Sequence, residues 1–358
     1  MRAAITGLGV AYPGVLRQDA LWEGFFSEYY EGSPLAERLW FRSGVRTRHG
    51  VVDPRDEDLS RWGTAARMRR FMAEAVPLGK ASLSSCLADA GLKPQDVDLL
   101  AIVSCTGYAT PGLDILLARD LGMRPDVQRL TVGHMGCYAA LPGLVTVTDA
   151  AVARGKVAVL LCLELTSLHI QPATTDVDQI VSHALFSDAA AALVLTAGGS
   201  NGQGSARMRA EPWPLEVVDV VARTDAPHAE LMTWDVTDMG FRMGLSPDVP
   251  RVLDQHVAEV VGDLLTAHGL VVDDVAGWAI HPGGPRIVDV VARQLGLTRA
   301  AVAASREVLR DHGNCSSATV LLILDRLRTG LRGGDPVVCV AFGPGLTIYA
   351  ALLRAVEP

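Results

Sequence analysis

Three residues far apart in the chain have side chains that together could carry out acyl transfer. Cys137 lies where the pattern predicts a helix start, His281 closes a short apolar strand before a glycine-rich loop, and Asn314 stands at a second predicted helix start. A helix start favours a thiolate because its unpaired N–H groups and dipole attract negative charge. A histidine can hold the cysteine as a thiolate, and histidine with an asparagine amide can bind a developing oxyanion or enolate. We therefore predict a cysteine-dependent acyl-transfer site.

Each of these residues also has a simpler interpretation. A cysteine in an apolar segment can be an inert thiol, a strand-end histidine can be merely hydrogen-bonded, and an asparagine before a helix can be an N-cap. The helix-start and loop contexts favour catalysis for Cys137 and His281, and capping by Asn314 is compatible with it. The other cysteines are structural by default: Cys86, Cys105, Cys162, Cys315 and Cys339. None of the cysteines has CxxC spacing, so neither a zinc site nor a redox dithiol is expected.

The elements that would position these residues occur twice in the chain. Three separated segments recur at one offset of 178 residues. The matched pairs are Gly91 with Gly269, Leu92 with Leu270, Asp96 with Asp274, Val97 with Val275, Ala101 with Ala279, His134 with His312, Cys137 with Cys315, Ala140 with Ala318 and Arg154 with Arg332. A repeat of half the chain length predicts two homologous α/β halves, residues 1–205 and 206–358. His281 takes the place of Val103, so the halves differ where chemistry is expected.

Each half has the same predicted order of elements. A helix ends at Gly91 or Gly269, where glycine tolerates the positive φ of a helix C-terminus. A buried strand follows, then a loop, a helix beginning near Cys137 or Asn314, and another strand. The expected strands span residues 99–104 and 157–163 in the first half and 277–281 and 336–341 in the second. They are apolar without alternation, which predicts mixed sheets between layers of helices, with the glycine-rich stretch 197–204 as the junction.

Three ordered motifs resemble those of the chalcone synthase, or type III polyketide synthase, family. They are HPGGP at residues 281–285, GNCSSATVL at 313–321 and FGPGLT at 342–347. The segments GVRTRH at 44–49 and FRMGLSPDVP at 241–250 extend the similarity along the chain. The resemblance implies a thiolase-like fold with αβαβα layers and a homodimer.

The resemblance also implies a mechanism. Cys137 would accept an acyl starter from coenzyme A. Malonyl-CoA would be decarboxylated while His281 and Asn314 stabilise the enolate, which then attacks the Cys137 thioester. Repeated extension would give a poly-β-keto chain that cyclises to a pyrone or phenolic product in the same cavity.

Further residues are assigned to the substrate cavity by the same resemblance. Phe186 matches a gatekeeper phenylalanine at the pantetheine tunnel, Met243 stands at the second gatekeeper position, and Trp234 replaces a glycine of plant enzymes and should block one lobe. Cys105 and His169 replace small cavity-lining residues. The expected set also includes Thr166, Ser316, Gly283 and Gly284, with Arg38 and Arg42 as the basic residues that hold the CoA phosphates. A core aromatic at Phe186 and a solvated basic face at the arginines are the alternatives. These departures resemble bacterial members, so chalcone is not the expected product.

Composition excludes several other classes of protein. The 358 residues are 49% hydrophobic and 20% charged, with a net charge of −8, which is typical of a globular protein without a nucleic-acid surface. No apolar run reaches the roughly 18 residues that a membrane span requires. The first nine residues predict a strand rather than a signal peptide. We expect a cytoplasmic enzyme with reduced thiols that uses acyl-CoA and malonyl-CoA and needs neither a metal nor a cofactor.

Two other functions remain open at this point. A ketoacyl-carrier-protein synthase III shares the fold and the Cys-His-Asn set, but that family usually has histidine-glutamine-alanine-asparagine where this chain has residues 281–284 as HPGG. A catalytically silent thiolase-fold subunit that scaffolds a partner is the second. The presence of Cys137, His281 and Asn314 together argues against it.

Overall fold

A nine-stranded mixed sheet runs through the centre of the molecule. The computed structural model describes residues 2–197 and 212–356, and the strand order is β11-β12-β13-β8-β1-β7-β6-β4-β5. The strands are β1 (Ala3–Ala11), β4 (Leu99–Ser104), β5 (Gln128–Gly133), β6 (Ala158–Glu164), β7 (Ala189–Ala197), β8 (Leu215–Thr224), β11 (Gly277–Ile280), β12 (Pro336–Gly343) and β13 (Thr347–Ala355). The expected boundary at residue 205, and all of the expected junction after residue 197, lie outside the described residues.

The two halves of this sheet have the same topology. β4 is parallel to β6, β6 is antiparallel to β7, and β7 is antiparallel to β1. The order β11, β12, β13 and β8 repeats these orientations. The halves join at β1 and β8, which pair only at Ala4 with Glu216 and at Ile5 with Leu215. The repeat at an offset of 178 residues therefore has a counterpart in strand order.

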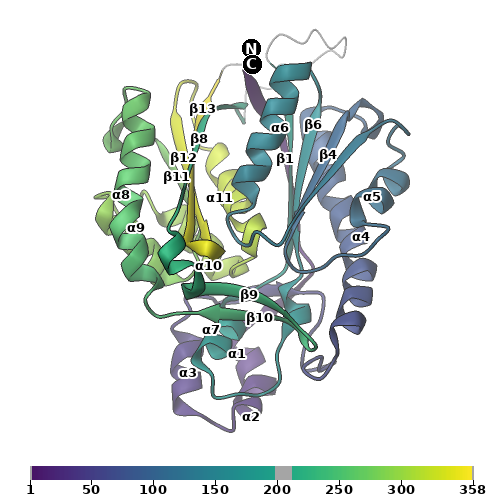
Figure 1. Ribbon diagram of the computed structural model, residues 1–358, viewed down its shortest axis with the longest axis vertical. Helices are drawn as coiled ribbons and strands as arrows, with labels where there is room; N and C mark the ends of the chain where they lie inside the picture. The colour runs from purple at the N-terminus through teal and green to yellow at the C-terminus, as the bar shows by residue number, and fades with distance from the viewer. Residues whose placement is uncertain (1, 198–211, 357–358) are drawn as a thin grey trace.

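Helices lie in three layers around the two halves of the sheet. Figure 1 shows α4 and α5 on one outer side, α8 and α9 on the other, and α6 and α11 between them. Their bounds are α4 (Thr64–Ala90), α5 (Leu113–Leu121), α6 (Ala140–Arg154), α8 (Val249–Ala267), α9 (Pro285–Gln294), α10 (Ala303–His312) and α11 (Thr319–Arg328). One apolar core joins α6 and α11 to both halves of the sheet, and two further cores pack the outer helices on it. The layers are αβαβα, as expected.

The ends of the helices follow the predicted pattern closely. α4 ends in front of Gly91 with φ 69°, and α8 is followed by Gly269 with φ 68°, conformations that cost glycine little. The helices after Cys137 and Asn314 begin later than expected. α6 begins three residues after Cys137, and the short 3₁₀ helix η6 (Ser316–Ala318) separates Asn314 from α11. None of the helices in the described ranges is long and apolar enough to span a membrane.

A smaller part of the chain lies below these layers (Figure 1). Its elements are β2 (Gly14–Arg17), α1 (Gln18–Leu21), the π-helix η1 (Trp22–Phe26), α2 (Ser27–Tyr29), α3 (Pro34–Phe41), β3 (Thr47–Gly50), η3 (Thr166–His169), α7 (Val177–Leu185), β9 (Met232–Thr237) and β10 (Gly240–Leu245). The remaining 3₁₀ turns are η2 (Pro94–Asp96), η4 (Ala226–Leu231), η5 (Val272–Asp274) and η7 (Pro344–Leu346). An aromatic core that includes Trp22, Phe26, Tyr30 and Trp40 holds this part together.

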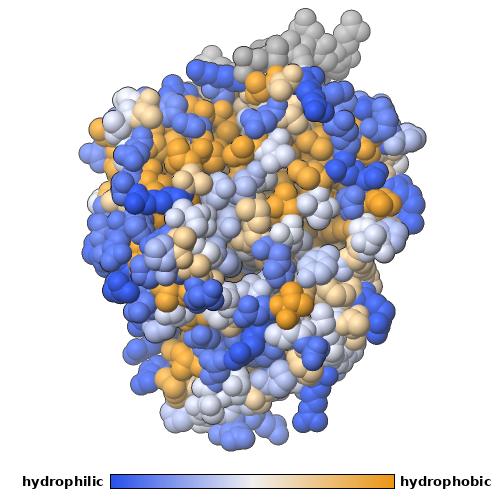
Figure 2. Space-filling view, in the orientation of Figure 1, coloured by the Kyte–Doolittle hydropathy of each residue, from blue (hydrophilic) through white to orange (hydrophobic). Residues whose placement is uncertain are grey.

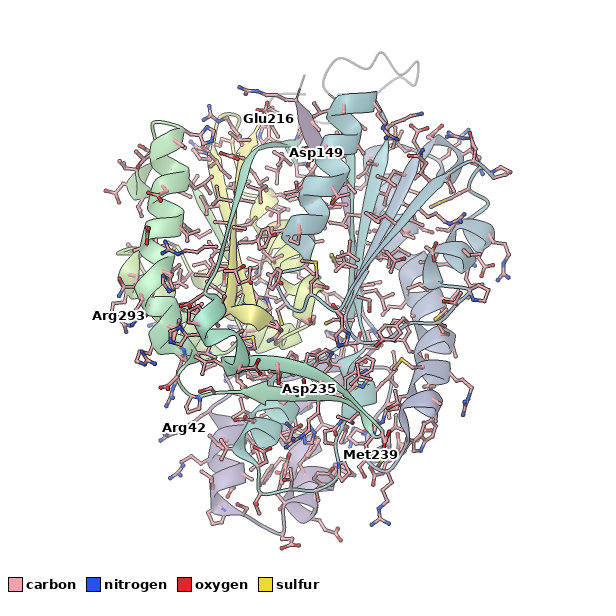
Figure 3. All side chains as sticks on the ribbon, viewed as in Figure 1. Arg42, Asp149, Glu216, Asp235, Met239 and Arg293 are labelled. Carbon is pink, nitrogen blue, oxygen red and sulfur yellow. The ribbon has the colours of Figure 1, made fainter. Side chains whose placement is uncertain are left out.

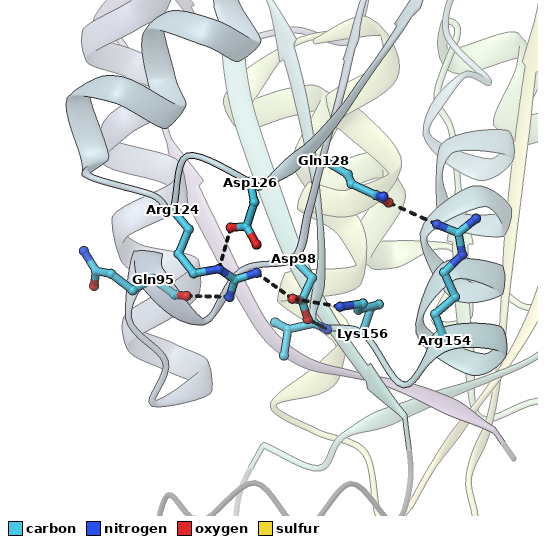
Figure 4. Close-up of polar contacts among 8 residues, drawn as sticks. Gln95, Asp98, Arg124, Asp126, Gln128, Arg154 and Lys156 are labelled. Atoms are coloured by element: carbon cyan, nitrogen blue, oxygen red, sulfur yellow. Dashed lines mark hydrogen bonds and ion pairs between the residues drawn. The ribbon is translucent and has the colours of Figure 1, made fainter.

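Polar contacts join the segments that precede β4, β5 and β6 (Figure 4). The Asp98 carboxylate accepts from Arg124 at 2.8 Å, from Lys156 at 3.3 Å and from the backbone N–H of Val157 at 3.0 Å. These contacts join the start of β4 to the segments that precede β5 and β6. Because the pairs are partly exposed, their contribution to stability is modest.

Candidate active site

Cys137 lies in the loop between β5 and α6, where the two halves of the chain meet, and its side chain is buried. The loop after β12 packs against it. A Cβ on Gly343 would lie 3.3 Å from the backbone nitrogen of Cys137, and a Cβ on Gly136 (φ 84°) would lie 2.5 Å from Pro344. Glycine at both positions therefore lets the second half approach the predicted nucleophile.

The environment of the Cys137 thiol differs from the helix-start expectation. The pKa of Cys137 is raised to about 12, chiefly by burial and with a smaller contribution from Glu164, while a hydrogen bond with the Ser316 hydroxyl lowers it in part. The direction is opposite to the one expected, because the loop removes the thiol from water and sets it before the first helical turn. Formation of the thiolate therefore requires a base within the site.

His281 follows the last residue of β11, and its ring is buried. Its backbone N–H donates to Val340 on β12 at 2.8 Å, which places it at the carboxyl end of the second half's parallel strands. Neither ring nitrogen has a hydrogen-bond partner among the described residues, and burial lowers the pKa of His281 to about 3. A buried imidazole without partners is costly, which makes His281 a candidate for a functional group.

Asn314 lies between α10 and η6 and is held through both its backbone and its side chain. Its backbone N–H donates to Leu185 and its carbonyl accepts from Ser187, each at 2.9 Å. The side-chain Oδ1 accepts from the Ser316 backbone N–H at 2.9 Å, which leaves the amide NH₂ as the available donor. Ser316 has a positive φ of 49°, a strained conformation of the kind that clusters at functional sites.

Cys137 lines one of two cavities that share part of their wall. The first has a volume of about 20 Å³ and is lined by Cys105, Thr106, Gly136, Cys137, Thr166, Phe186, Trp234, Met243, Ser316 and Pro344. The second, of about 50 Å³, shares Thr166, Phe186, Trp234 and Met243 with the first and is also lined by His169. Cys137 thus faces a narrow space. His281 and Asn314 do not line it, and Asn314 is bonded to Ser316, which does, and to the segment that carries Phe186.

Hydrogen bonds hold the largest side chains of the cavity wall in place. The Trp234 indole N–H donates to the Cys105 carbonyl at 2.7 Å. His169 donates from Nε2 to the Thr106 carbonyl at 2.6 Å and accepts at Nδ1 from the Phe241 backbone at 3.0 Å, and its ring stacks on that of Phe241. Hydrogen bonds therefore hold two of the three side chains that the sequence predicted to be enlarged, Trp234 and His169.

Family models match almost the whole of the chain. The model of the N-terminal domain of chalcone and stilbene synthases matches residues 2–199, and that of the C-terminal domain matches residues 220–357. The chain belongs to the chalcone and stilbene synthase family of type III polyketide synthases. It is a decarboxylating acyltransferase of this family.

Curated relatives place this type III polyketide synthase among bacterial members. It is 32% identical over 329 residues to the alpha-pyrone synthesis polyketide synthase-like Pks18 of Mycobacterium tuberculosis, covering 89% of this chain and 82% of the relative. It is 35% identical over 329 residues to the 1,3,6,8-tetrahydroxynaphthalene synthase of Streptomyces peucetius subsp. caesius, covering 89% and 83%. It is 37% identical over 284 residues to the 3,5-dihydroxyphenylacetyl-CoA synthase of Amycolatopsis balhimycina, covering 78% and 74%.

Solved structures confirm the fold of the synthase. The C-terminal type III polyketide synthase domain of Steely1 from Dictyostelium superposes with a TM-score of 0.91 at 25% identity, covering 99% of this chain and all of that one. PKS-I from the brown alga Ectocarpus siliculosus superposes with a TM-score of 0.89 at 28% identity, covering 99% and 98%. The expected thiolase-like layering is therefore correct.

Four residues predicted to bind substrate lie away from both cavities. Gly283 and Gly284 form the turn between His281 and α9, and the φ of 156° at Gly284 shows that this turn needs glycine for its backbone. Arg38 and Arg42 are exposed on α3 and directly after it, and Figure 3 shows Arg42 at the outer surface of the molecule. A role for these arginines in CoA binding remains a prediction.

Sequence reasoning missed the buried carboxyl of Glu164 at the end of β6. This group accepts from the Cys105 backbone N–H at 3.0 Å, from the Thr106 hydroxyl at 2.8 Å and from the Ser317 hydroxyl. Burial raises its pKa, and the hydrogen bonds oppose that shift. Glu164 joins the wall at Cys105 to the loop after Asn314. A single acidic residue at the end of an otherwise apolar strand was the available signal.

The synthase is expected to lose stability as the pH falls, because several buried histidines are neutral when it is folded. Burial lowers their pKa values from 6.5: His49 to about 4, and His169, His183 and His281 to about 3. Below pH 6.5 the unfolded chain binds protons that the folded chain does not, so the free energy of unfolding decreases. We expect a loss of at least about 3 kcal/mol between about pH 7 and about pH 5 in urea denaturation.

Asp188 provides the control for this pH dependence. Burial raises its pKa from 3.8 to about 6, so in that interval the folded chain binds the extra proton and stability rises as the pH falls. Glu164, whose pKa burial also raises, acts in the same direction, but the histidines outnumber the two carboxyls. The Asp188→Asn variant should therefore lose stability more steeply than the wild type. Stability that is flat or increases from pH 7 to pH 5 would contradict neutral histidines.

Proposed function

We propose that this synthase loads an acyl-CoA starter on Cys137, extends it with malonyl-CoA and cyclises the product to a pyrone or a phenolic ring. The observation that carries the proposal is that Cys137 lines a narrow cavity, while the buried ring of His281 has no hydrogen-bond partner among the described residues. Asn314 supplies a second polar group whose amide NH₂ is available to donate. Cysteine, histidine and asparagine in these roles suit thioester exchange and enolate stabilisation.

In the loading step, His281 removes the proton from the Cys137 thiol. The thiolate attacks the acyl-CoA carbonyl, the carbon–sulfur bond to CoA breaks, and the CoA thiolate leaves with the proton that His281 held. The low pKa of His281 and the high pKa of Cys137 disfavour an ion pair in the empty site. The transfer is therefore coupled to binding of the thioester, whose carbonyl oxygen offers His281 and Asn314 a polar partner.

In the extension step, malonyl-CoA loses its carboxylate as CO₂. The electrons of the broken carbon–carbon bond move to the thioester carbonyl, where N–H donors of His281 and Asn314 stabilise the enolate oxygen. The enolate carbon then attacks the acyl group on Cys137, and the cysteine leaves as a thiolate. The narrow cavity keeps water away from both the enolate and the thioester, and Trp234, Met243 and Phe186 limit the length of the chain that can fold there.

Substrate delivery and location follow from this chemistry. CoA thioesters are the proposed substrates, Arg38 and Arg42 are the proposed contacts for the CoA phosphates, and no cofactor is required for a decarboxylative condensation. A cytoplasmic location is proposed because CoA thioesters are available there. Among the described residues no group of three or more histidine, cysteine, aspartate or glutamate side chains could hold a metal ion.

A homodimer is proposed on the basis of the free edge of the sheet. β5 is the terminal strand, and most of its side chains are exposed, including Leu130 at 38%. Figure 2 shows hydrophobic side chains gathered over the upper half of the face on which Figure 1 draws α6 and β8. An unpaired edge beside an apolar surface is suited to pairing with a second copy. Sedimentation should give a dimer, and Leu130→Asp should shift it to monomer; a monomeric wild type would contradict the proposal.

The decisive experiment is incubation of the purified protein with labelled malonyl-CoA and a panel of acyl-CoA starters, followed by mass spectrometry. Pyrones or phenolic rings would support the proposal and identify the starter. Turnover only with malonyl carrier protein would favour a synthase III-like activity. No product with either donor would overturn the proposal and favour a silent scaffold.

A further inference from the structure

Arg48 on β3 is a buried cation whose hydrogen-bond partners are all neutral. Its Nε donates to Gln18 Oε1 at 2.9 Å, and Nη1 donates to the carbonyls of His183 at 2.6 Å and Phe186 at 2.9 Å. Nη2 donates to Gln18 Oε1 and to the Ala184 carbonyl. All five N–H groups of the guanidinium are engaged, so Arg48 cannot bind a substrate anion through them. Burial of a guanidinium without a carboxylate partner is costly and calls for a specific role.

The three carbonyls that Arg48 holds belong to the C-terminal end of α7. α7 ends at Leu185, and Phe186 follows it in an extended conformation. The last carbonyls of a helix have no partner within it and carry the negative end of its dipole. The Arg48 guanidinium therefore satisfies most of the carbonyls at the end of α7, with Gln18 Nε2 as a second donor to the Ala184 carbonyl at 3.0 Å.

The same short segment carries two parts of the active site. The Phe186 ring lines both cavities. Leu185 and Ser187, on either side of it, make the two backbone hydrogen bonds that hold Asn314 at 2.9 Å each. Arg48 and Asn314 thus both bond to this one segment, and Arg48 also lines the larger cavity.

We propose that Arg48 is a positioning residue that sets both the Phe186 ring and the Asn314 amide by fixing the chain at the end of α7. The proposal rests on the roles proposed above for Phe186 and Asn314. Displacement of the Phe186 carbonyl moves its neighbours Leu185 and Ser187, and with them the loop that presents the Asn314 amide to the enolate. A shift of about 1 Å in such a group is enough to cost roughly 100-fold in rate.

Arg67 on α4 offers a matched control. It is also fully buried, and it donates only to carbonyls, those of Trp62, Leu59, Ser60 and Leu168. Arg67 holds the loop before α4 and the turn η3, but neither the end of α7 nor Asn314. Replacement of either arginine by lysine removes the same forked donor and keeps the charge, so the two variants should lose comparable stability.

The test compares Arg48→Lys with Arg67→Lys in malonyl-CoA decarboxylation, which requires the enolate site but no starter. We expect Arg48→Lys to lower kcat for decarboxylation at least tenfold with KM changed less than threefold, and Arg67→Lys to keep kcat within about twofold. Iodoacetamide alkylation of Cys137, which does not use Asn314, should proceed at similar rates in both variants. Melting temperatures show whether each variant is folded.

A milder variant keeps the proposal testable if Arg48→Lys does not fold. Gln18→Ala removes the acceptor of two Arg48 hydrogen bonds but retains the guanidinium, and it should lower the same kcat about threefold. Equal decarboxylation kcat in Arg48→Lys, Gln18→Ala and Arg67→Lys, with the wild type active, would overturn the positioning role. A wild type that does not decarboxylate malonyl-CoA would instead overturn the proposed function, and this inference with it.

Discussion

The Cys137→Ala variant is expected to lose polyketide formation by at least about 1,000-fold while it still decarboxylates malonyl-CoA. The acyl chain has no attachment point without the thiol, because the thiol of Cys137 faces the cavity that would hold the starter. In the proposed mechanism enolate formation requires only His281 and Asn314, which belong to the second half of the chain and keep their own backbone hydrogen bonds. Product mass spectrometry and CO₂ release from labelled malonyl-CoA measure the two steps separately.

Cys339→Ala is the matched control for this prediction. Cys339 is a buried thiol in the core of β12 and lines neither cavity, so its removal should leave condensation within about twofold while it costs some stability. Undiminished polyketide formation by Cys137→Ala would exclude it as the nucleophile. Loss of decarboxylation together with condensation would mean that the thiol also supports the enolate.

The Trp234→Gly variant is expected to accept longer starters or to carry out more extensions than the wild type. Trp234 lines both cavities, so removal of its indole should merge them into one larger space. We expect kcat/KM for a medium-chain acyl-CoA to rise at least about tenfold relative to a short one, since each added methylene accommodated is worth about 1–3 kcal/mol. Liquid chromatography with mass spectrometry across starter lengths measures the change.

Trp234→Phe separates the volume of the side chain from its hydrogen bond. Phenylalanine retains most of the ring but loses the N–H that donates to Cys105 at 2.7 Å. It should keep the wild-type product profile if volume decides starter choice. An unchanged product profile in Trp234→Gly would show that the indole does not limit the length of the polyketide chain. If Trp234→Phe shifts the profile as much as Trp234→Gly does, starter choice depends on the hydrogen bond to Cys105 rather than on the volume of the side chain.

Features carried by local pattern could be predicted from the sequence. The repeat at an offset of 178 residues anticipated two halves with the same strand order, because each half must bury the same apolar strands. Gly91 and Gly269 marked helix ends because few other residues adopt a positive φ. The family followed from three motifs in order along the chain. Cys105, Phe186, Trp234, Met243 and His169 line the two cavities, and their contact with substrate remains a prediction.

Only the tertiary structure decided the environment of each group. The sequence placed Cys137 at a helix start, but the folded loop buries the thiol before α6 and raises its pKa, because desolvation outweighs the helix dipole. The hydrogen bonds of two buried charged groups are made by residues distant in sequence. The Glu164 carboxyl accepts from the Cys105 backbone N–H, and the Arg48 guanidinium donates to the Phe186 carbonyl. Composition and spacing therefore determined the fold and the chemistry available to this protein, while burial and long-range hydrogen bonds determined the protonation and the positions of the groups that use it.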